Sequence, residues 1–423
     1  MRARVFRQVA LFLFLLPATA AITGCAANSI DSSQTSSAQP SAGSPPPSIR
    51  AAHLALADSG NSRVLIYDAP IGNGASASVV LGQPNFTDSA NSGNDAYPNT
   101  VSPGGIARDA EGDLFVTDGN HCRVLEFQPP FTMGMNASVA IGWPSLTYTN
   151  ARGNYCLSDR VSTLQDPVAV ATDSQGDLWV ADQQIGKVYE YVPPFSTGMA
   201  ASVVIGTPLC DGSILGSVVP TAQNFCEPVG IAFDPEGDLW VSDPGFSRVL
   251  EFEPPFSTGM AASLEIGQPA FTSWDQCSPT PSASCLAPAA VAFDAGGNLW
   301  VADPPDNRVL EFAPPFTNGM AACLVLGQPD FTSGALKATA ANAFYFHSSG
   351  ASAVEEDGGL WFDSSGDLLV GDGGNERILV FTPPFSNDMN ASSAIGQPNT
   401  TSGGPCAVPA TSTLCAPRGI LTY

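Results

Sequence analysis

The chain has 423 residues, of which 39 are Asp or Glu and 15 are Lys or Arg, giving a formal net charge of −24 at pH 7. Nucleic-acid binding needs clustered basic side chains, and a surface this acidic repels phosphate, so that class of partner is excluded. Basic or calcium-bridged partners are favoured instead.

The N-terminal segment, residues 1–24, predicts export. Three arginines precede an apolar run at residues 9–17, and residues 22–25 read Ile-Thr-Gly-Cys. This series is typical of a signal peptide, and it resembles bacterial lipoproteins, which implies cleavage before Cys25 and lipidation of that residue. The alternatives are an ordinary secretory signal with a chance Cys, or a membrane anchor, for which the run is short.

Residues 25–50 predict a flexible tether. They are rich in Ser, Ala, Pro and Gln and carry almost no charge, so they cannot bury a core. Removing residues 1–24, which hold three Arg and no acid, leaves 12 basic against 39 acidic residues. We expect a chain attached to the bacterial cell envelope by its lipid alone, on the periplasmic face or the cell surface.

Residues 51–423 form a tandem repeat. An Asp that ends an apolar run recurs at intervals of 60, 64, 61, 60 and 69 residues, and self-similarity at such a period indicates an array. The recurring residues are Asp58, Asp118, Asp182, Asp243, Asp303 and Asp372.

One unit predicts four antiparallel strands. Residues 230–234 and 238–242 are apolar runs separated by Pro-Glu-Gly, residues 248–252 follow, and residues 263–266 come after a Pro-Pro-Phe turn. Four such strands are typical of a propeller blade. A small residue recurs in the first strands, at Ala107, Ala171, Ala232 and Ala292. This pattern predicts that large side chains are excluded near the axis.

The two ends of the chain predict how the ring closes. Residues 417–423 form a lone first strand, and residues 53–58 form a second strand with no first. Pairing them completes a blade and leaves no exposed sheet edge. The fold class is therefore all-β, a six-bladed propeller of four-stranded blades that we expect to be monomeric.

The units resemble the NHL-repeat family of β-propellers. The resemblance spans residues 51–423 and is clearest at Ile231-Ala232, at Gly237-Asp238, and at Asp303 with Asn307-Arg308-Val309. It implies the propeller fold, but members of the family differ widely in function, so function has to be argued from a site.

Basic residues stand five positions after the repeat Asp, which places each pair across one tight hairpin where a charge-assisted bond would fix the turn. Because the pairs recur in every blade, they favour a scaffold role. The pairs are Asp58 with Arg63, Asp118 with Arg123, Asp182 with Lys187, Asp243 with Arg248, Asp303 with Arg308, and Asp372 with Arg377.

Cysteine spacing predicts disulfides in an oxidising compartment. Three pairs occupy the crossover between blades, namely Cys210 with Cys226, Cys277 with Cys285, and Cys406 with Cys415; Cys122 and Cys156 form a fourth candidate. Zinc binding by these pairs lacks the short ligand spacing. Cys323 is left over and is predicted to be a buried free thiol.

The sixth unit departs most from the repeat pattern. Departures from such patterns occur most often at functional sites, so this unit supplies the candidate site. Its crossover is the longest, and a Trp stands where most units have Ala. The alternative is a solvated acidic loop with an aromatic plug. The ligand-binding candidates are His121, Tyr345, His347, Glu355, Glu356, Asp357 and Trp361, with His347 and Glu356 as weak catalytic candidates.

Metal binding stays open. His121, His347 and an acid could hold one ion, whereas His53 is expected on the opposite face. The acids after the first strands begin Asp-x-x-Gly turns and are expected to cap them, although calcium on such carboxylates is possible. These acids are Asp109, Asp173, Asp234, Asp294 and Asp363.

These observations predict a lipid-anchored binding or scaffold module for a protein, a glycan or another extracytoplasmic ligand. The site would be the face built from the turns between second and third strands and the disulfide-closed crossovers. The alternative is a metal-dependent lyase or lactonase-like hydrolase with its site at the channel mouth, because six-bladed relatives include such enzymes. That chemistry needs His, Asp and Glu side chains converging at the axis.

Overall fold

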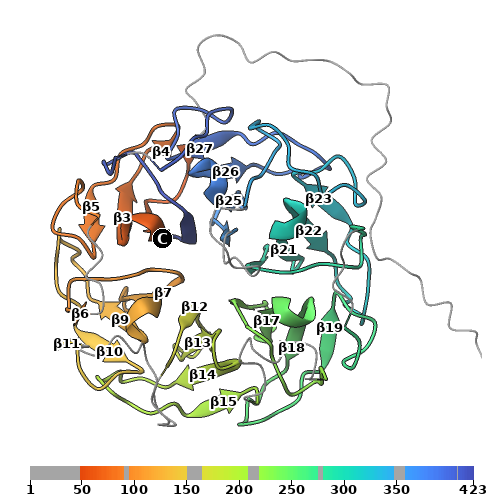
Figure 1. Cartoon of the computed structure of the whole chain (residues 1–423), viewed down its shortest axis with the longest axis horizontal. Helices are drawn as coiled ribbons and strands as arrows, with labels where there is room; N and C mark the ends of the chain where they lie inside the picture. The colour runs from red at the N-terminus through yellow and green to blue at the C-terminus, as the bar shows by residue number, and fades with distance from the viewer. Residues whose placement is uncertain are drawn as a thin grey trace, which may run out of the picture.

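The structure is a computed structural model, and it describes residues 48–89, 95–149, 164–207, 219–274, 280–346, 358–406 and 408–423. Within these ranges, six four-stranded antiparallel sheets are arranged around a common axis (Figure 1). The predicted all-β, six-bladed propeller is confirmed. None of the helices in these residues has the length and hydropathy needed to cross a membrane.

The first three blades follow the chain outward from the axis, except that blade 1 takes its first strand from the C-terminus. Blade 1 contains β28 (Pro417–Thr422), β2 (His53–Asp58), β3 (Arg63–Asp68) and β5 (Val79–Leu81). Blade 2 contains β7 (Ile106–Arg108), β8 (Leu114–Asp118), β9 (Arg123–Phe127) and β10 (Val139–Ile141). Blade 3 contains β12 (Pro167–Thr172), β13 (Leu178–Asp182), β14 (Lys187–Tyr191) and β15 (Val203–Ile205).

The other three blades repeat this order. Blade 4 contains β16 (Gly230–Phe233), β17 (Leu239–Asp243), β18 (Arg248–Phe252) and β19 (Leu264–Ile266). Blade 5 contains β20 (Val291–Phe293), β21 (Leu299–Asp303), β22 (Arg308–Phe312) and β23 (Leu324–Leu326). Blade 6 contains β24 (Leu360–Phe362), β25 (Leu368–Asp372), β26 (Arg377–Phe381) and β27 (Ser393–Ile395).

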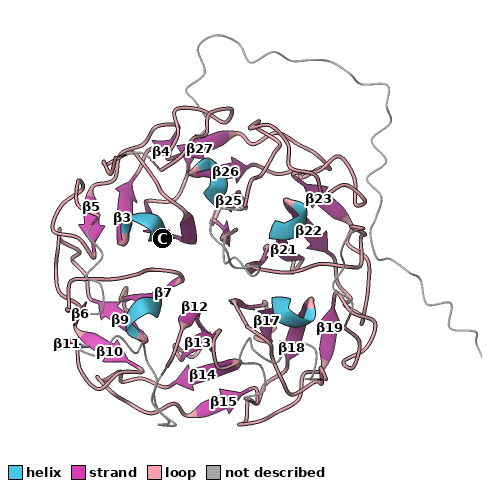
Figure 2. Ribbon diagram, in the orientation of Figure 1, coloured by secondary structure: helices cyan, strands magenta, loops and turns pink. Residues whose placement is uncertain are grey.

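Short elements decorate the blades. A 3-10 helix links the second and third strands of every blade except blade 3 (Figure 2), at Ser59–Asn61, Gly119–His121, Pro244–Phe246, Pro304–Asp306 and Gly373–Asn375. Two further ladders pair β1 (Ser48–Ile49) with β4 (Ile71–Gly72), and β6 (Asp95–Ala96) with β11 (Tyr148–Thr149). Ile49 is buried between blades 6 and 1, so contact with the propeller begins inside the segment assigned to the tether.

The ring closes as the sequence predicts. β28 pairs antiparallel with β2, from Leu54 opposite Thr422 to Asp58 opposite Pro417. At the end of this ladder His53 and Tyr423 exchange two backbone hydrogen bonds of 2.9 and 3.1 Å. The C-terminus therefore lies on the inner side of the ring, beside the axis (Figure 1).

Aromatic side chains join blades 3, 4, 5 and 6. The Trp179 indole Nε1 donates a 3.0 Å hydrogen bond to Asp173 in its own blade, and the ring packs edge-on against Phe256 of the next blade, 4.7 Å between centroids. Trp240 and Trp300 repeat both contacts. Edge-to-face aromatic pairs add to the stability that their buried area provides.

Backbone hydrogen bonds run around the rim in one direction. In each blade the tight turn before the fourth strand donates an N–H to a carbonyl of the preceding blade, at distances of 2.9–3.2 Å; five of the acceptors lie in the fourth strand, and Gln397 lies two residues after β27. The donors and acceptors are Gly134 to Val80, Gly198 to Ala140, Gly259 to Val204, Gly319 to Glu265, Asp388 to Val325, and Gly74 to Gln397. The last pair crosses the closure between blades 6 and 1.

All six cysteines in the described part of the chain are disulfide-bonded. Cys406 and Cys415 bond to each other, with their Cα atoms 4.8 Å apart. Cys122, Cys226, Cys285 and Cys323 are also disulfide-bonded, and the predicted partners Cys156, Cys210 and Cys277 lie outside the described residues. The prediction of a free, buried thiol at Cys323 is wrong. This residue precedes the outermost strand of blade 5 and is partly exposed, so a partner can reach it.

Glu265, on the fourth strand of blade 4, is fully buried. Its side chain lies 3.5 Å from an Arg248 nitrogen, and its Oε1 has no hydrogen-bond partner. Burial raises the pKa of Glu265 from 4.5 to about 7, although Arg248 opposes the shift. Folding therefore favours the protonated form, so stability falls as pH rises from about 4.5 through 7.

We expect Glu265→Gln to stabilise the protein at pH 8 and to change little at pH 5, because Gln keeps the shape without a charge. The difference between the two pH values should be on the order of 2–3 kcal/mol, the linkage equivalent of this pKa shift. Thermal melts at both pH values measure it, with the exposed Glu253→Gln in the same blade as control. A variant that loses as much stability as the native chain between pH 5 and 8 would contradict the assignment.

Candidate functional site

The repeat Asp residues lie buried where the second strand meets the turn to the third, and five of them bind the Arg five positions later. The Asp Oδ2 to Arg Nε distances are 2.5–3.0 Å, at Asp58–Arg63, Asp118–Arg123, Asp243–Arg248, Asp303–Arg308 and Asp372–Arg377. In blade 3, Lys187 stands opposite Asp182, whose carboxylate accepts hydrogen bonds from the backbone N–H groups of Gln165 and Asp166. The repeat Asp residues and their partners therefore hold the hairpin of the second and third strands to the crossover that precedes the blade.

His121 belongs to this network. Its ring is buried, and Nδ1 lies 2.8 Å from Asp118 Oδ1. Asn61 and Asn375 occupy the same repeat position and donate to their own repeat Asp. Burial alone would raise the pKa of Asp118, but the hydrogen bond with His121 and the charge of Arg123 outweigh it and lower that pKa. The contacts of His121 are thus those of a structural residue.

The other predicted candidates divide into two groups. Tyr345 is half-buried, and its backbone N–H donates to Asp372 Oδ1 at 2.7 Å, a bond that crossover residues make in other blades. Trp361 lies in the first strand of blade 6 and lines the central channel. His347, Glu355, Glu356 and Asp357 lie outside the described residues, as does Cys25.

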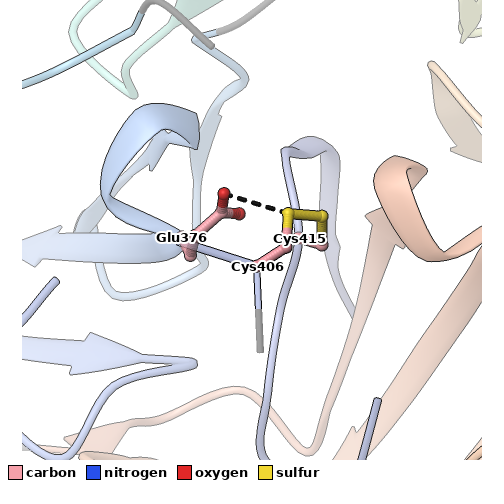
Figure 3. A group of neighbouring side chains, drawn as sticks. All are labelled: Glu376, Cys406 and Cys415. Carbon is pink, nitrogen blue, oxygen red and sulfur yellow. Dashed lines mark hydrogen bonds between the residues drawn. A yellow bond between two sulfur atoms is a disulfide. The ribbon is translucent and has the colours of Figure 1, made fainter. Parts of the chain in front are cut away.

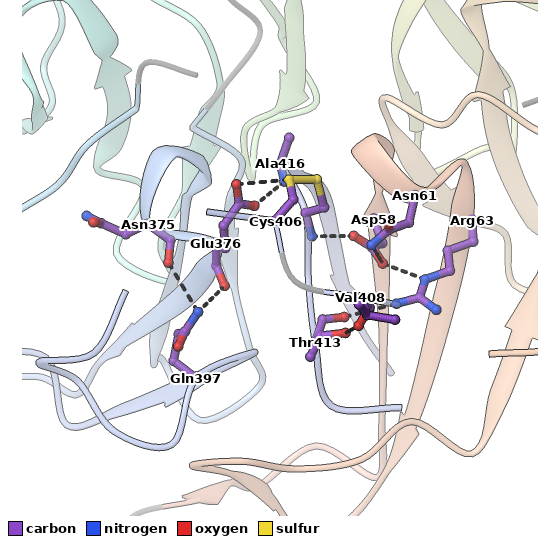
Figure 4. The surroundings of a disulfide bond; sticks show 11 residues. Asp58, Asn61, Arg63, Asn375, Glu376, Gln397, Cys406, Val408, Thr413 and Ala416 are labelled. Carbon is purple, nitrogen blue, oxygen red and sulfur yellow. Dashed lines mark hydrogen bonds and ion pairs between the residues drawn. A yellow bond between two sulfur atoms is a disulfide. The ribbon is translucent and has the colours of Figure 1, made fainter. Parts of the chain in front are cut away.

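The Cys406–Cys415 disulfide lies at the closure between blades 6 and 1. Glu376 Oε1 is 3.1 Å from Cys406 Sγ (Figure 3), and Glu376 Oε2 accepts a hydrogen bond from the Ala416 N–H. On the other side, the Cys415 N–H donates to Asp58 Oδ1 at 2.6 Å (Figure 4). Although these three side chains cluster, the cysteines are oxidised and offer no thiolate to a metal. The group is a structural clamp.

Two further clusters bring three carboxylates together, Asp173, Asp177 and Glu190 in blade 3, and Asp234, Asp238 and Glu251 in blade 4. The Asp oxygens are already used: Asp234 Oδ1 accepts the N–H groups of Glu236 and Asp238, and Oδ2 accepts the Trp240 indole. Burial raises the pKa of Asp238 to about 6, and the charge of Asp234 adds to the shift. The Asp234 contacts are those expected of a turn cap.

A channel at the axis is lined by the first strands of all six blades and contains a cavity of about 340 Å³. Its wall contains the small residues that the sequence places there, Ala107, Ala171, Ala232 and Ala292. Among the described residues that line it, none is His, Asp or Glu. The described lining residues are apolar apart from their backbone and from Thr172, Arg108 and Arg418.

One end of this channel has an aromatic wall. The ends of the first strands contribute Phe233, Phe293 and Phe362 there, and blade 2 contributes Arg108 at the same register position. The guanidinium carbon of Arg108 lies 4.6 Å from the centre of the Tyr423 ring. Next to it, the Trp361 indole donates a 2.9 Å hydrogen bond to Thr422. Arg108 Nε is buried without a hydrogen-bond partner.

Comparison with known proteins supports no assignment to a family. No family model matches the sequence, and none of the curated proteins matches it. Solved structures with a similar arrangement include the periplasmic gluconolactonase of Pseudomonas aeruginosa, with 14% identity, TM-score 0.48, and coverage of 87% of this chain and 98% of that one.

A protein of unknown function from Bacteroides caccae has 9% identity and a TM-score of 0.47, with coverage of 88% of this chain and 98% of that one. Virginiamycin B lyase from Staphylococcus aureus has 12% identity and a TM-score of 0.36, with coverage of 67% of this chain and 71% of that one. These solved structures are propeller lactonases and lyases as far as their names state an activity. At these identities and TM-scores they carry no argument about this chain. The resemblance to NHL-repeat proteins and to lipoproteins stays a prediction.

Arg108 and Tyr423 are the residues that sequence reasoning missed. Arg108 stands where blades 4, 5 and 6 have Phe and blade 3 has Thr, so a register comparison of the first strands would have marked it. Tyr423 is the last residue of the chain, and its ring meets Arg108 only because the ring of blades closes.

Proposed function

We propose that this chain is an exported propeller that binds a small ligand in its central channel. The observation that carries the proposal is the axial cavity of about 340 Å³, which combines an apolar and aromatic wall with a guanidinium at its end. Small-molecule sites are typically concave, largely apolar and about 300–1,000 Å³ in volume, with a few polar groups that orient the ligand. Disulfide bonding of every described cysteine supports export.

Ligand-observed NMR with a library of small organic molecules of mixed charge tests this function. The protein is purified from the cell envelope as cells process it, and each hit is repeated on Ala171→Trp and Ala232→Trp, which fill the channel from two blades. We expect hits whose signal is lost on at least one folded variant. If every hit binds the channel-filled variants as well as the native chain, the channel is not the site.

A metal-dependent lyase or lactonase-like hydrolase is the second candidate. The observation in its favour is that Glu355, Glu356 and Asp357 come just before Gly359 in the chain, and Gly359 lines the channel. Carboxylates and His347 are suitable metal ligands. Lactones and lyase substrates are the classes to screen, because those activities are the alternative predicted from the sequence.

Metal analysis of chain purified without chelator, with thermal melts before and after EDTA, distinguishes the two candidates. A stoichiometric metal and an EDTA-sensitive melt would favour the enzyme, or a calcium-braced binder, and would justify a lactone and lyase screen. In that case His347→Ala and Glu356→Ala should abolish turnover without unfolding the protein. Turnover retained in both variants would remove this site.

A further inference from the structure

We propose that the channel ligand is a monocarboxylate with an apolar or aromatic body, and that Arg108 binds its carboxylate. This inference rests on the proposed function and names the class of ligand. Four observations support this inference. The Arg108 guanidinium is unpaired, and it packs on the Tyr423 ring. The described channel wall contains no carboxylate, and its side chains next to Arg108 are apolar or aromatic.

The charge of Arg108 has no acidic partner. The five buried repeat arginines each bind an Asp, and Lys337 lies 2.9 Å from Asp388. Arg108, in contrast, makes no ion pair or side-chain hydrogen bond with the described residues, and its Nε is buried. The neighbouring Asp109 caps its own turn, because its Oδ1 accepts the N–H groups of Gly112 and Asp113. A guanidinium without a partner in a chain this acidic is unusual.

The platform beneath Arg108 fixes its position. Tyr423 lies under the guanidinium at 4.6 Å and stacks on His53 at 5.0 Å between ring centroids. His53 in turn lies 2.8 Å from Asp68, and its backbone pairs with Tyr423. A guanidinium stacked on an aromatic ring keeps the N–H donors at its edge available for a planar carboxylate, which it can bind with two parallel hydrogen bonds.

The wall selects the rest of the ligand. Trp361, Phe233, Phe293 and Phe362 line the channel and favour an apolar or aromatic body. Arg418 also lines the channel, but it stands at the opposite end of β28 from Tyr423, so Arg108 is the arginine at the aromatic end among the described lining residues. One guanidinium matches one negative charge, whereas a phosphate dianion would need further donors or cations to offset its desolvation. With no Asp or Glu among the described lining residues, nothing in that wall opposes a carboxylate.

Matched pairs of probes test the inference: octanoate with octanamide, and 4-phenylbutyrate with 4-phenylbutanamide. Titration calorimetry on the protein as processed by cells should show each acid binding roughly 10- to 100-fold more tightly than its amide, the range expected of a charged hydrogen bond. Arg108→Gln should abolish this preference and leave amide binding unchanged. Arg50→Gln, at an exposed position before β2, should keep the preference.

The outcomes separate this inference from the proposed function. If an acid and its amide bind the native chain with equal affinity, the role of Arg108 is overturned. If the channel-filled variants then lose binding of both the acid and the amide, the proposed function still stands. If none of the four probes binds, the monocarboxylate class is overturned, and library hits that need the open channel would still support a different ligand. Because the acid-to-amide ratio is measured on the native chain, the test holds even if Arg108→Gln fails to fold.

Discussion

Replacing Arg308 with Met is expected to lower the free energy of unfolding by about 3–5 kcal/mol, the range seen when one partner of a buried ion pair is removed. Arg308 is fully buried, its Nε donates to Asp303 at 2.8 Å, and its other nitrogens donate to the carbonyls of Phe331, Ser282 and Cys285. Met fills a similar volume but leaves the carboxylate and three carbonyls without these donors. Urea unfolding measures the change.

The matched control is Lys337→Met. Lys337 also pairs with an Asp, Asp388 at 2.9 Å, but both side chains are partly exposed, so its loss should cost less than about 1 kcal/mol. Arg308→Lys should fall between the two, because it keeps the charge but not the fork of donors. Blade 3 already carries a Lys at this position. Comparable losses in Arg308→Met and Lys337→Met would show that burial does not set the strength of these pairs.

Deleting residues 417–423 is expected to cause the largest loss of any change considered. The deletion removes the first strand of blade 1, including the buried Ile420 and Leu421, and exposes the edge of β2. We expect a loss of at least ~5 kcal/mol from buried side chains and ladder hydrogen bonds. An exposed edge also favours association between chains, so light scattering and thermal melts are the measurements.

A circular permutant serves as control. His53 and Tyr423 are hydrogen-bonded through their backbones, so a short Gly-Ser linker can join them, with new ends at the exposed turn of Pro235 and Glu236. This chain keeps every blade strand but lacks residues 1–52 and with them β1, so its reference is a chain that begins at His53, and the two should melt close together. If the truncated chain remained monomeric with an unchanged melt, the closing strand would not be what holds the ring together.

Local patterns predicted the fold because each signal needs only a few neighbouring residues. The Pro-Glu-Gly turn and its flanking apolar runs fix the hairpin of β16 and β17, and the unpaired strands at the two ends leave only one way to close the ring. The pairing of repeat Asp and Arg residues follows from the same hairpin geometry, in which Asp243 and Arg248 face each other.

The site was harder to predict because its contacts are not local. His121 has the chemistry of a metal ligand, but comparison with Asn61 and Asn375 at the same repeat position would have indicated its structural role. The platform of Arg108 and Tyr423 joins the second blade to the last residue of the chain. The disulfide bonding of Cys323 was also missed, because the repeat spacing pairs the other cysteines and leaves this one over.

The rim hydrogen bonds give the ring a polarity that matters whenever it opens. Every donor belongs to a later blade and every acceptor to the one before it, and the bond from Gly74 to Gln397 completes the circuit. Bonds from fourth-strand N–H groups to side chains of the following blade, such as Ala140 to Thr197 Oγ1, run the other way. An opened ring would therefore have two different ends that complement each other, like the monomer of a linear polymer. Two such rings would fit head to tail, as in a heterologous assembly, and closed and chain-like forms would compete for the same bonds.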